Sequence, residues 1–157
     1  DALVKLIVGI IGLWYTADLV WKRRKKTEFA ARPADIPRGI FWGSLAGFTS
    51  FVAHSGGTPY QMFVLPQKLD KMTYAGTATI TFTFINMLKL PPYFMLGQIN
   101  TSSLQQGLYL APVALFGAWA GFRLTKILPE KLFFRCVEIA LILVSMTLIW
   151  DAYRALV

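Results

Sequence analysis

A short polar segment interrupts an apolar stretch of this chain and constrains the fold more than any other feature. Residues 54–59 read His-Ser-Gly-Gly-Thr-Pro, between Phe41 and Trp42 on one side and Met62 and Phe63 on the other. Inside a bilayer, backbone that is not helical is tolerated only where protein buries it or where it lines a wet cavity. The segment, which holds the only histidine of the chain, is therefore a candidate ligand site.

The composition predicts an integral membrane protein. Of the 157 residues, 55% are hydrophobic and only 15% are charged, whereas a soluble domain has about 25% charged residues. The net charge of +8 comes from basic residues that cluster between apolar spans, which is a topology signal rather than a nucleic-acid surface. The single Cys136 excludes an internal disulfide and any site with several cysteines. We expect no nucleic-acid partner and no cofactor.

Apolar runs of about 20 residues, enough to cross a hydrocarbon core of about 30 Å, predict the membrane spans. The first helix is expected within residues 1–21, and a basic cytoplasmic linker follows over residues 22–39. Transmembrane helices are expected over residues 73–96, 104–122 and 132–152. We expect Pro91 and Pro92 to end the regular helix of their span, because proline removes a backbone donor.

Residues 40–66 are too long for one plain helix and too short for two full crossings. A re-entrant hairpin with two half-depth arms fits this length, with its tip at residues 54–59. A returning hairpin places all the basic segments in the cytoplasm and the uncharged loop 97–103 outside, as the positive-inside rule requires. A single crossing would move two basic segments outside. The sequence therefore predicts a hairpin, and places both termini outside. The basic segments are residues 22–38, 68–71 and 123–131.

The third span is unusually polar. Its threonines alternate from Thr77 to Thr83 with the period of a strand, but a lone strand in lipid leaves its edges unsatisfied, which favours helix. On a helix, Thr79, Thr83 and Asn86 share one face and are candidate cavity-lining residues. The alternative is that these threonines bond carbonyls of their own helix.

The break itself carries the chemistry expected of a substrate site. Gly56 and Gly57 permit backbone conformations that expose N–H groups, and Thr58 with Pro59 is a natural start for a half-helix. A helix start at membrane depth presents partial positive charge and unpaired donors, which suit an anion. The alternative for the glycine pair is a plain turn. Neutral donors come from Ser55, Thr58 and Gln61.

The lone His54 has two interpretations. It can donate a hydrogen bond or carry a proton, because an unperturbed histidine titrates near neutral pH. Alternatively, it is a packed residue without a chemical role. Small residues elsewhere predict close helix packing, in the first arm of the hairpin at Gly43, Ala46 and Gly47, and in the fourth span at Gly117 and Gly121.

The chain resembles the second half of the sulfite exporter TauE/SafE family, also called the toluene sulfonate uptake family. The resemblance spans nearly the whole chain after Lys22, and its motifs are residues 47–59, 65–69, 76–79, 88–93 and 150–151. The family's break is a fuller glycine run, part of which His54 and Ser55 replace here. The family implies two inverted repeats, each with a re-entrant hairpin and three spans, that move small sulfur-containing or carboxylated anions.

On this resemblance, residues 1–21 are the last helix of a first repeat and residues 40–157 are the second repeat. The chain is then a fragment, or a second chain supplies the missing first repeat. The expected function is transport of sulfite, sulfonates or other organosulfur or carboxylate anions across the inner membrane, with no enzyme activity. Exact substrate, direction and oligomeric state stay open. Proton coupling and a flux driven by the membrane potential also stay as alternatives.

Two other functions compete with transport. The chain could be a channel-like or scaffold membrane subunit, in which the break merely kinks a helix and this half holds no substrate site. A helix continuous through residues 54–59 would favour that function. A membrane enzyme using His54 as acid or base is disfavoured, because the spans hold no second histidine and Asp18, Glu138 and Asp151 lie near span ends.

Overall fold

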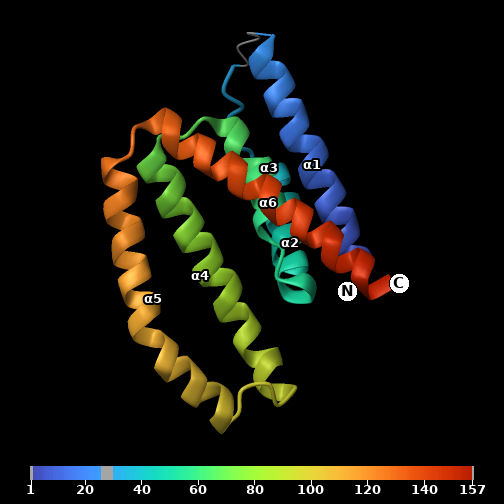
Figure 1. Cartoon of the computed structure of the whole chain (residues 1–157), viewed down its shortest axis with the longest axis vertical. Helices are drawn as coiled ribbons and strands as arrows, with labels where there is room; N and C mark the ends of the chain where they lie inside the picture. Colours follow the sequence, from blue (N-terminus) through green and yellow to red (C-terminus); the bar gives the residue numbers. More distant parts are fainter. Residues whose placement is uncertain (1, 26–29, 157) are drawn as a thin grey trace. The chain divides into compact units, whose positions relative to one another are not determined.

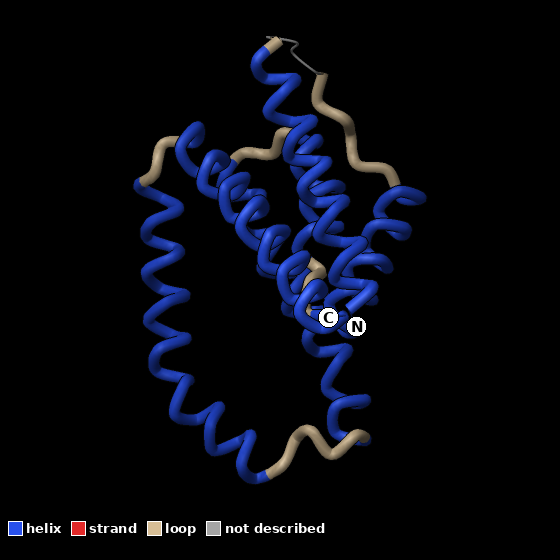
Figure 2. The backbone as a smooth tube through the Cα atoms, turned by 45° about the vertical axis from the view of Figure 1, so that its right-hand side comes forward, coloured by secondary structure: helices blue, strands red, loops and turns tan. Residues whose placement is uncertain are grey.

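The computed structural model describes residues 2–25 and 30–156, and this part of the chain is helical, with no strand (Figure 1 and Figure 2). The all-α class is therefore confirmed, including helix for the threonine-rich span. Residues 26–29 of the predicted basic linker, and both terminal residues, lie outside the described part. The elements are α1 (Ala2–Arg24), α2 (Ile36–Ala53), α3 (Gly57–Val64), the 3-10 helix η1 (Leu65–Gln67), α4 (Lys71–Met95), α5 (Thr101–Ile127) and α6 (Glu130–Leu156).

Three helices of the described chain are long and apolar enough to cross a membrane, namely α1 over Ala2–Lys22, α5 and α6. Helix α4 has 25 residues, or about 38 Å of helix, which is sufficient length. Its threonines, Asn86 and Lys89 lower its hydropathy below that of the other three. The crossing of α4 that the sequence predicts therefore stays a prediction.

The prediction that Pro91 and Pro92 end the regular helix is wrong. Both lie inside α4, which continues to Met95. The two backbone N–H donors that the prolines lack belong to the last turns of the helix. Helical hydrogen bonding resumes beyond the prolines, where Leu96 N–H donates to Pro92 O at 3.0 Å. Helix α4 ends where Gly97 takes a φ of 68°, a left-handed conformation that glycine adopts without strain.

Two predicted loops are shorter than expected. Helix α5 begins inside the predicted loop 97–103 because Asn100 and Ser103 form a capping box. Asn100 Oδ1 accepts from Ser103 N–H at 3.0 Å, and Ser103 Oγ accepts from Asn100 N–H at 2.9 Å. The basic segment 123–131 is largely helical, since α5 runs to Ile127 and α6 begins at Glu130.

The chain divides into two compact units, Asp1–Leu69 with Phe134–Val157 and Asp70–Phe133. In the second unit, α4 and α5 run in opposite directions (Figure 1). Lys71 Nζ donates to Lys126 O at 2.9 Å and to Leu128 O at 2.6 Å, so a cation satisfies carbonyls at the end of α5. Two of the basic segments therefore meet at the same end of this helix pair.

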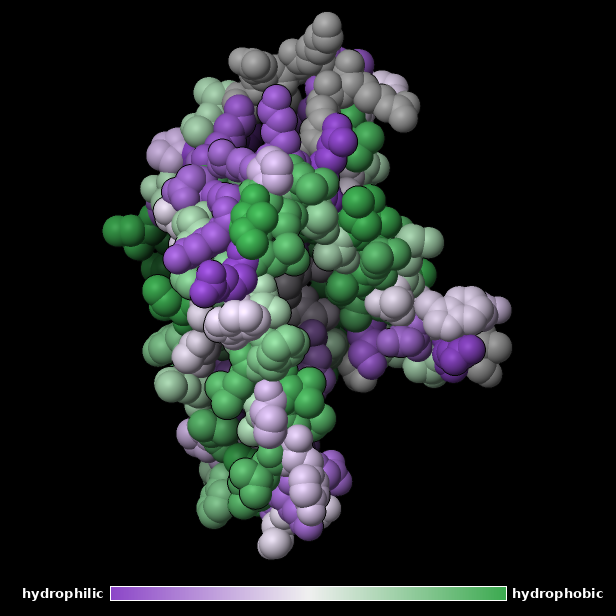
Figure 3. Space-filling model, turned by 60° about the vertical axis from the view of Figure 1, so that its left-hand side comes forward, coloured by the Kyte–Doolittle hydropathy of each residue, from purple (hydrophilic) through white to green (hydrophobic). Residues whose placement is uncertain are grey.

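The surface of α5 is apolar and exposed. No residue of this helix, which is described throughout, is buried, and Leu108, Tyr109 and Leu115 are 74%, 72% and 73% exposed. Figure 3 shows hydrophobic side chains over much of the face that it displays. An apolar surface of this kind is suited to contact with lipid or with another membrane protein.

In the first unit, α1 and the C-terminal part of α6 approach closely at two glycines. A Cβ added at Gly9 would lie 2.9 Å from Ser145 O and 2.7 Å from Ile149 Cγ1, and one added at Gly12 would lie 2.2 Å from Ser145 Oγ. Small residues permit such contacts between membrane helices. Apart from Leu141, the largest fully buried side chains are those of small hydroxyl residues, namely Thr16, Thr49, Thr58 and Ser145.

Helix α2 begins at a carboxylate cap. Asp35 Oδ1 accepts from Arg38 N–H at 2.8 Å, and the other oxygen pairs with the Arg38 guanidinium. These two bonds to Arg38 favour the charged form and hold the pKa of Asp35 below its usual value. Pro37 supports the same start, because its ring suits the first turn of a helix. The cap also holds the Arg38 side chain at the entrance of α2.

Candidate functional site

The break begins where one carbonyl closes α2. Thr49 O accepts from the N–H groups of His54 and Ser55, the latter at 3.2 Å, and from Ser55 Oγ at 3.4 Å. His54 has a φ of 51° and a ψ of 26°, a left-handed conformation that glycine usually provides at helix ends. Its side chain is exposed. His54 therefore contributes to the turn through its backbone.

We expect the substitution His54→Gly to raise the free energy of unfolding by about 1 kcal/mol. The left-handed conformation costs a non-glycine residue about 1–2 kcal/mol, and the greater freedom of glycine in the unfolded chain offsets part of this gain. The measurement is the thermal midpoint of the purified protein in detergent. His54→Ala is the matched control, since alanine keeps the strain. An equal gain in both variants would show that backbone strain is not the cause.

The second helix of the break starts two residues earlier than predicted. The expected N-cap Thr58 is wrong, because Gly56 occupies that position and its carbonyl accepts from Tyr60 N–H at 3.3 Å. Thr58 and Pro59 are then the second and third residues of α3. The missing N–H of Pro59 costs no bond there, since the first N–H groups of a helix have no partner within it.

Gly56 is the point where α3 turns back onto α2. A Cβ added to Gly56 would lie 2.5 Å from Ala46 O and 2.7 Å from Ser50 Cβ. Further along, Arg32 N–H donates to Pro66 O at 3.0 Å and ties η1 to the approach of α2. The expectation of close packing in the first arm thus holds at Ala46, whereas added Cβ atoms at Gly43 and Gly47 would meet nothing within 4 Å.

Thr58 and Ser145 are buried side by side with unused hydroxyl groups. They are 1% and 0% exposed, and neither Thr58 Oγ1 nor Ser145 Oγ has a hydrogen-bond partner among the described residues. The two side chains meet at Gly12, whose added Cβ would lie 3.0 Å from Thr58 Cγ2 and 2.2 Å from Ser145 Oγ. Gln61, one turn further along α3, also has a buried oxygen, Oε1, that bonds to nothing in the part of the chain that the structure describes. Buried polar atoms left unpaired are costly and call for an explanation.

Thr58 also lines an apolar cavity of about 330 Å³ between α1, α2 and α3. The opposite walls include Ile7, Ile11 and Phe48. The cavity has a second threonine, Thr49, but its hydroxyl donates to Leu45 O at 2.8 Å. The cavity is therefore an apolar space beside the first turn of α3, and the Thr58 hydroxyl is buried behind its apolar wall.

The remaining predicted site residues have different surroundings in the two units. Gly57 lies at the first turn of α3 but an added Cβ would meet nothing within 4 Å, and Ser55 is buried with its hydroxyl directed to Thr49 O. The other three predicted site residues belong to the second unit, and they are exposed. One of them, Thr79, donates its hydroxyl hydrogen to Ala75 O at 2.9 Å. That bond is the alternative expected for threonines of this span. The three residues are Thr79, Thr83 and Asn86.

Sequence reasoning missed the contributions of α1 and α6. Gly9, Gly12 and Ser145 were not predicted site residues, yet they form the contact that buries Thr58. The available signal was the pair of glycines three residues apart, which share one face of a helix. By contrast, the predicted small pair Gly117 and Gly121 meets nothing within 4 Å of an added Cβ.

A comparison with protein families identifies the chain. The model of the family described as sulfite exporter TauE/SafE matches residues 1–148. The chain therefore belongs to this family and is a multi-pass membrane transporter. No curated protein and no solved structure matches it.

Proposed function

We propose that this member of the sulfite exporter TauE/SafE family carries small organic anions and binds them at the first turn of α3. The observation that carries the proposal is the buried, uncommitted Thr58 hydroxyl beside an apolar cavity of about 330 Å³. A hydroxyl donor and the N-terminal N–H groups of α3 suit a sulfonate or carboxylate group. The apolar walls suit a short alkyl or aryl body.

The break supports a transporter rather than a scaffold. Helix α2 ends at Ala53 and α3 begins at Gly57, so the helix is interrupted at the break. A helix continuous through the break would instead have favoured the scaffold function. We take α2, α3 and η1 as the re-entrant hairpin. Helix α2 has 18 residues, about 27 Å of helix, and α3 has eight, about 12 Å. The short arm is insufficient for a full crossing of about 30 Å.

The charge distribution supports one orientation. Lys71 and Lys126 lie at the same end of the α4 and α5 pair, and the opposite end, residues 96–100, has no charge. With the basic ends in the cytoplasm, α4 crosses the inner membrane and both termini lie outside. Residues 40–157 then form the second repeat of an inverted pair, α1 closes the first repeat, and that repeat or a second chain supplies the other half of the site.

We expect Thr58→Val to lower the transport rate at low substrate concentration about tenfold. Valine keeps the shape of threonine, so the packing against Gly12 is retained, but one hydrogen bond to a charged substrate is lost. The assay is uptake of sulfite, methanesulfonate and toluene sulfonate into liposomes that contain the purified protein. A substrate with an apolar body should be carried better than sulfite.

Thr125→Val is the matched control, because Thr125 is bonded to Gly121 O at 2.9 Å within the second unit. It should leave transport unchanged. If Thr58→Val transports like the wild type, the site assignment is wrong. Coupling is tested separately under an imposed pH gradient: a response of the wild type that His54→Gln loses supports proton coupling through His54, and a wild type that responds only to the membrane potential supports a flux driven by that potential.

A further inference from the structure

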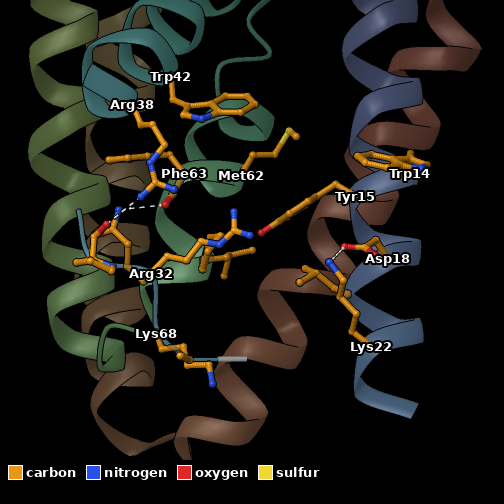
Figure 4. A pocket seen from close by; sticks show the side chains of 16 residues that line it. Trp14, Tyr15, Asp18, Lys22, Arg32, Arg38, Trp42, Met62, Phe63 and Lys68 are labelled. Atoms are coloured by element: carbon orange, nitrogen blue, oxygen red, sulfur yellow. Dashed lines mark hydrogen bonds and ion pairs between the residues drawn. The ribbon is translucent and has the colours of Figure 1, made fainter. Parts of the chain in front are cut away.

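A larger pocket, of about 840 Å³, lies in the first unit at the opposite end of α3 from the break. The end of α1, residues 30–33, the start of α2, and the end of α3 with η1 enclose it (Figure 4). Trp42 and Met62 line both this pocket and the apolar cavity, so the two spaces are neighbours. None of the predicted substrate-binding residues lines it.

The pocket is positively charged. Among the described residues, one acidic side chain, Asp18, lines it and pairs with Lys22, while Arg38 pairs with Asp35 outside the lining. Arg32 is exposed, and its backbone is held in place because its N–H donates to Pro66 O. Figure 4 shows its guanidinium reaching across the pocket toward Tyr15. The part of the chain that the structure describes contributes four basic side chains to the lining, namely Lys22, Arg32, Arg38 and Lys68.

The other walls are aromatic and apolar. Trp14 of α1, Trp42 of α2 and Phe63 of α3 line the pocket, and Figure 4 shows Trp42 and Phe63 on the same side as Arg38 and Trp14 on the opposite side. Trp14 is 68% exposed on a helix apolar enough to span the membrane. Lys22 is the last residue of that span, and basic side chains at the end of a span are typical of the headgroup region.

We propose that this pocket binds the headgroup of an acidic phospholipid from the cytoplasmic leaflet. The phosphate would lie against Arg32, and the first carbons of the acyl chains against Trp14 and Phe63. Basic pockets between membrane helices on the cytoplasmic side bind such headgroups. A free inorganic anion offers the same charge chemistry, but its volume is that of one or two waters, about 30–60 Å³, and it would leave the aromatic walls without contacts.

The test is native mass spectrometry of the purified protein in detergent, titrated in parallel with phosphatidylglycerol and phosphatidylcholine, together with its thermal midpoint in each lipid. We expect phosphatidylglycerol to bind more tightly and to raise the midpoint further. Arg32→Gln should weaken phosphatidylglycerol binding about fivefold. Lys131→Gln is the matched control, because Lys131 is an exposed lysine that does not line the pocket.

Trp14→Ala separates the two sources of the anion. It should weaken phosphatidylglycerol binding and leave the effect of inorganic phosphate on the thermal midpoint unchanged. If inorganic phosphate stabilises the protein as much as phosphatidylglycerol does, the pocket holds a soluble anion and the proposal is overturned. Equal effects of Arg32→Gln and Lys131→Gln would also overturn it. The substrate assay with Thr58→Val is independent of these results.

Discussion

The substitution Gly56→Ala is expected to lower the free energy of unfolding by about 3 kcal/mol and to abolish transport. The added methyl group would lie 2.5 Å from Ala46 O and 2.7 Å from Ser50 Cβ. Because the nearest atom belongs to the backbone of α2, no change of rotamer relieves the contact. The two arms must separate, at a cost near the upper end of that measured for overpacked cores, about 1–3 kcal/mol. The measurements are thermal unfolding in detergent and uptake into liposomes.

The neighbouring glycine provides the control. A Cβ added to Gly57 meets nothing within 4 Å, and the residue is helical. Gly57→Ala is therefore expected to keep transport and to stabilise the protein by up to about 1 kcal/mol, the difference in helix propensity. Two adjacent glycines should thus respond with opposite signs. Equal losses in both variants would contradict the assignment of Gly56 as the contact between the arms.

The second large effect is expected at the crossing of α1 and α6. Gly9→Ala places a methyl group 2.9 Å from Ser145 O, 2.7 Å from Ile149 Cγ1 and 3.2 Å from Ile149 N. Two of these atoms are backbone, so the helices must move apart, and we expect a loss of about 2–3 kcal/mol. Since this crossing buries Thr58, transport should fall with stability. Thermal unfolding and uptake are again the measurements.

A double variant distinguishes this backbone contact from a side-chain contact. The methyl group of Gly12→Ala lies 2.2 Å from Ser145 Oγ but 3.3 Å from Ser145 Cβ, so Ser145→Ala should restore most of the stability lost in Gly12→Ala. The same change should not rescue Gly9→Ala, whose contact is with the carbonyl of residue 145. Gly117→Ala, which meets nothing within 4 Å, should be neutral or mildly stabilising. Rescue of both α1 variants would contradict the proposed crossing.

Much of the fold could be predicted because membrane helices are encoded locally. Apolar length and flanking charge located α1, α5 and α6, and the polar segment 54–59 located the break between α2 and α3. The predicted helix ends were wrong where two local sequence signals competed. The prolines of α4 were expected to end the helix, but near its C-terminus they remove few bonds, and Gly97 supplies the end instead.

The candidate site was predictable only in part. Polar residues in an apolar stretch indicated Thr58, Ser55 and Gln61, whose roles differ in the structure: Ser55 closes α2, while Thr58 and Gln61 keep unpaired polar atoms. His54 had two interpretations, an imidazole with a chemical role or a packed residue, and its left-handed backbone explains its position in the turn. Nothing local in the sequence distinguishes Gly56 from Gly57, which differ only in what lies beside them.

The sequence by itself determined that this chain is a helical membrane protein with a broken segment of a transporter family, because hydropathy, charge and motif are properties of contiguous residues. Only the tertiary structure decided which residues of the break are buried together. Gly12 of α1, Thr58 of α3 and Ser145 of α6 are far apart in the chain. Their meeting depends on glycines that let helix backbones approach within a few ångströms, and that geometry exists only when the helices are packed.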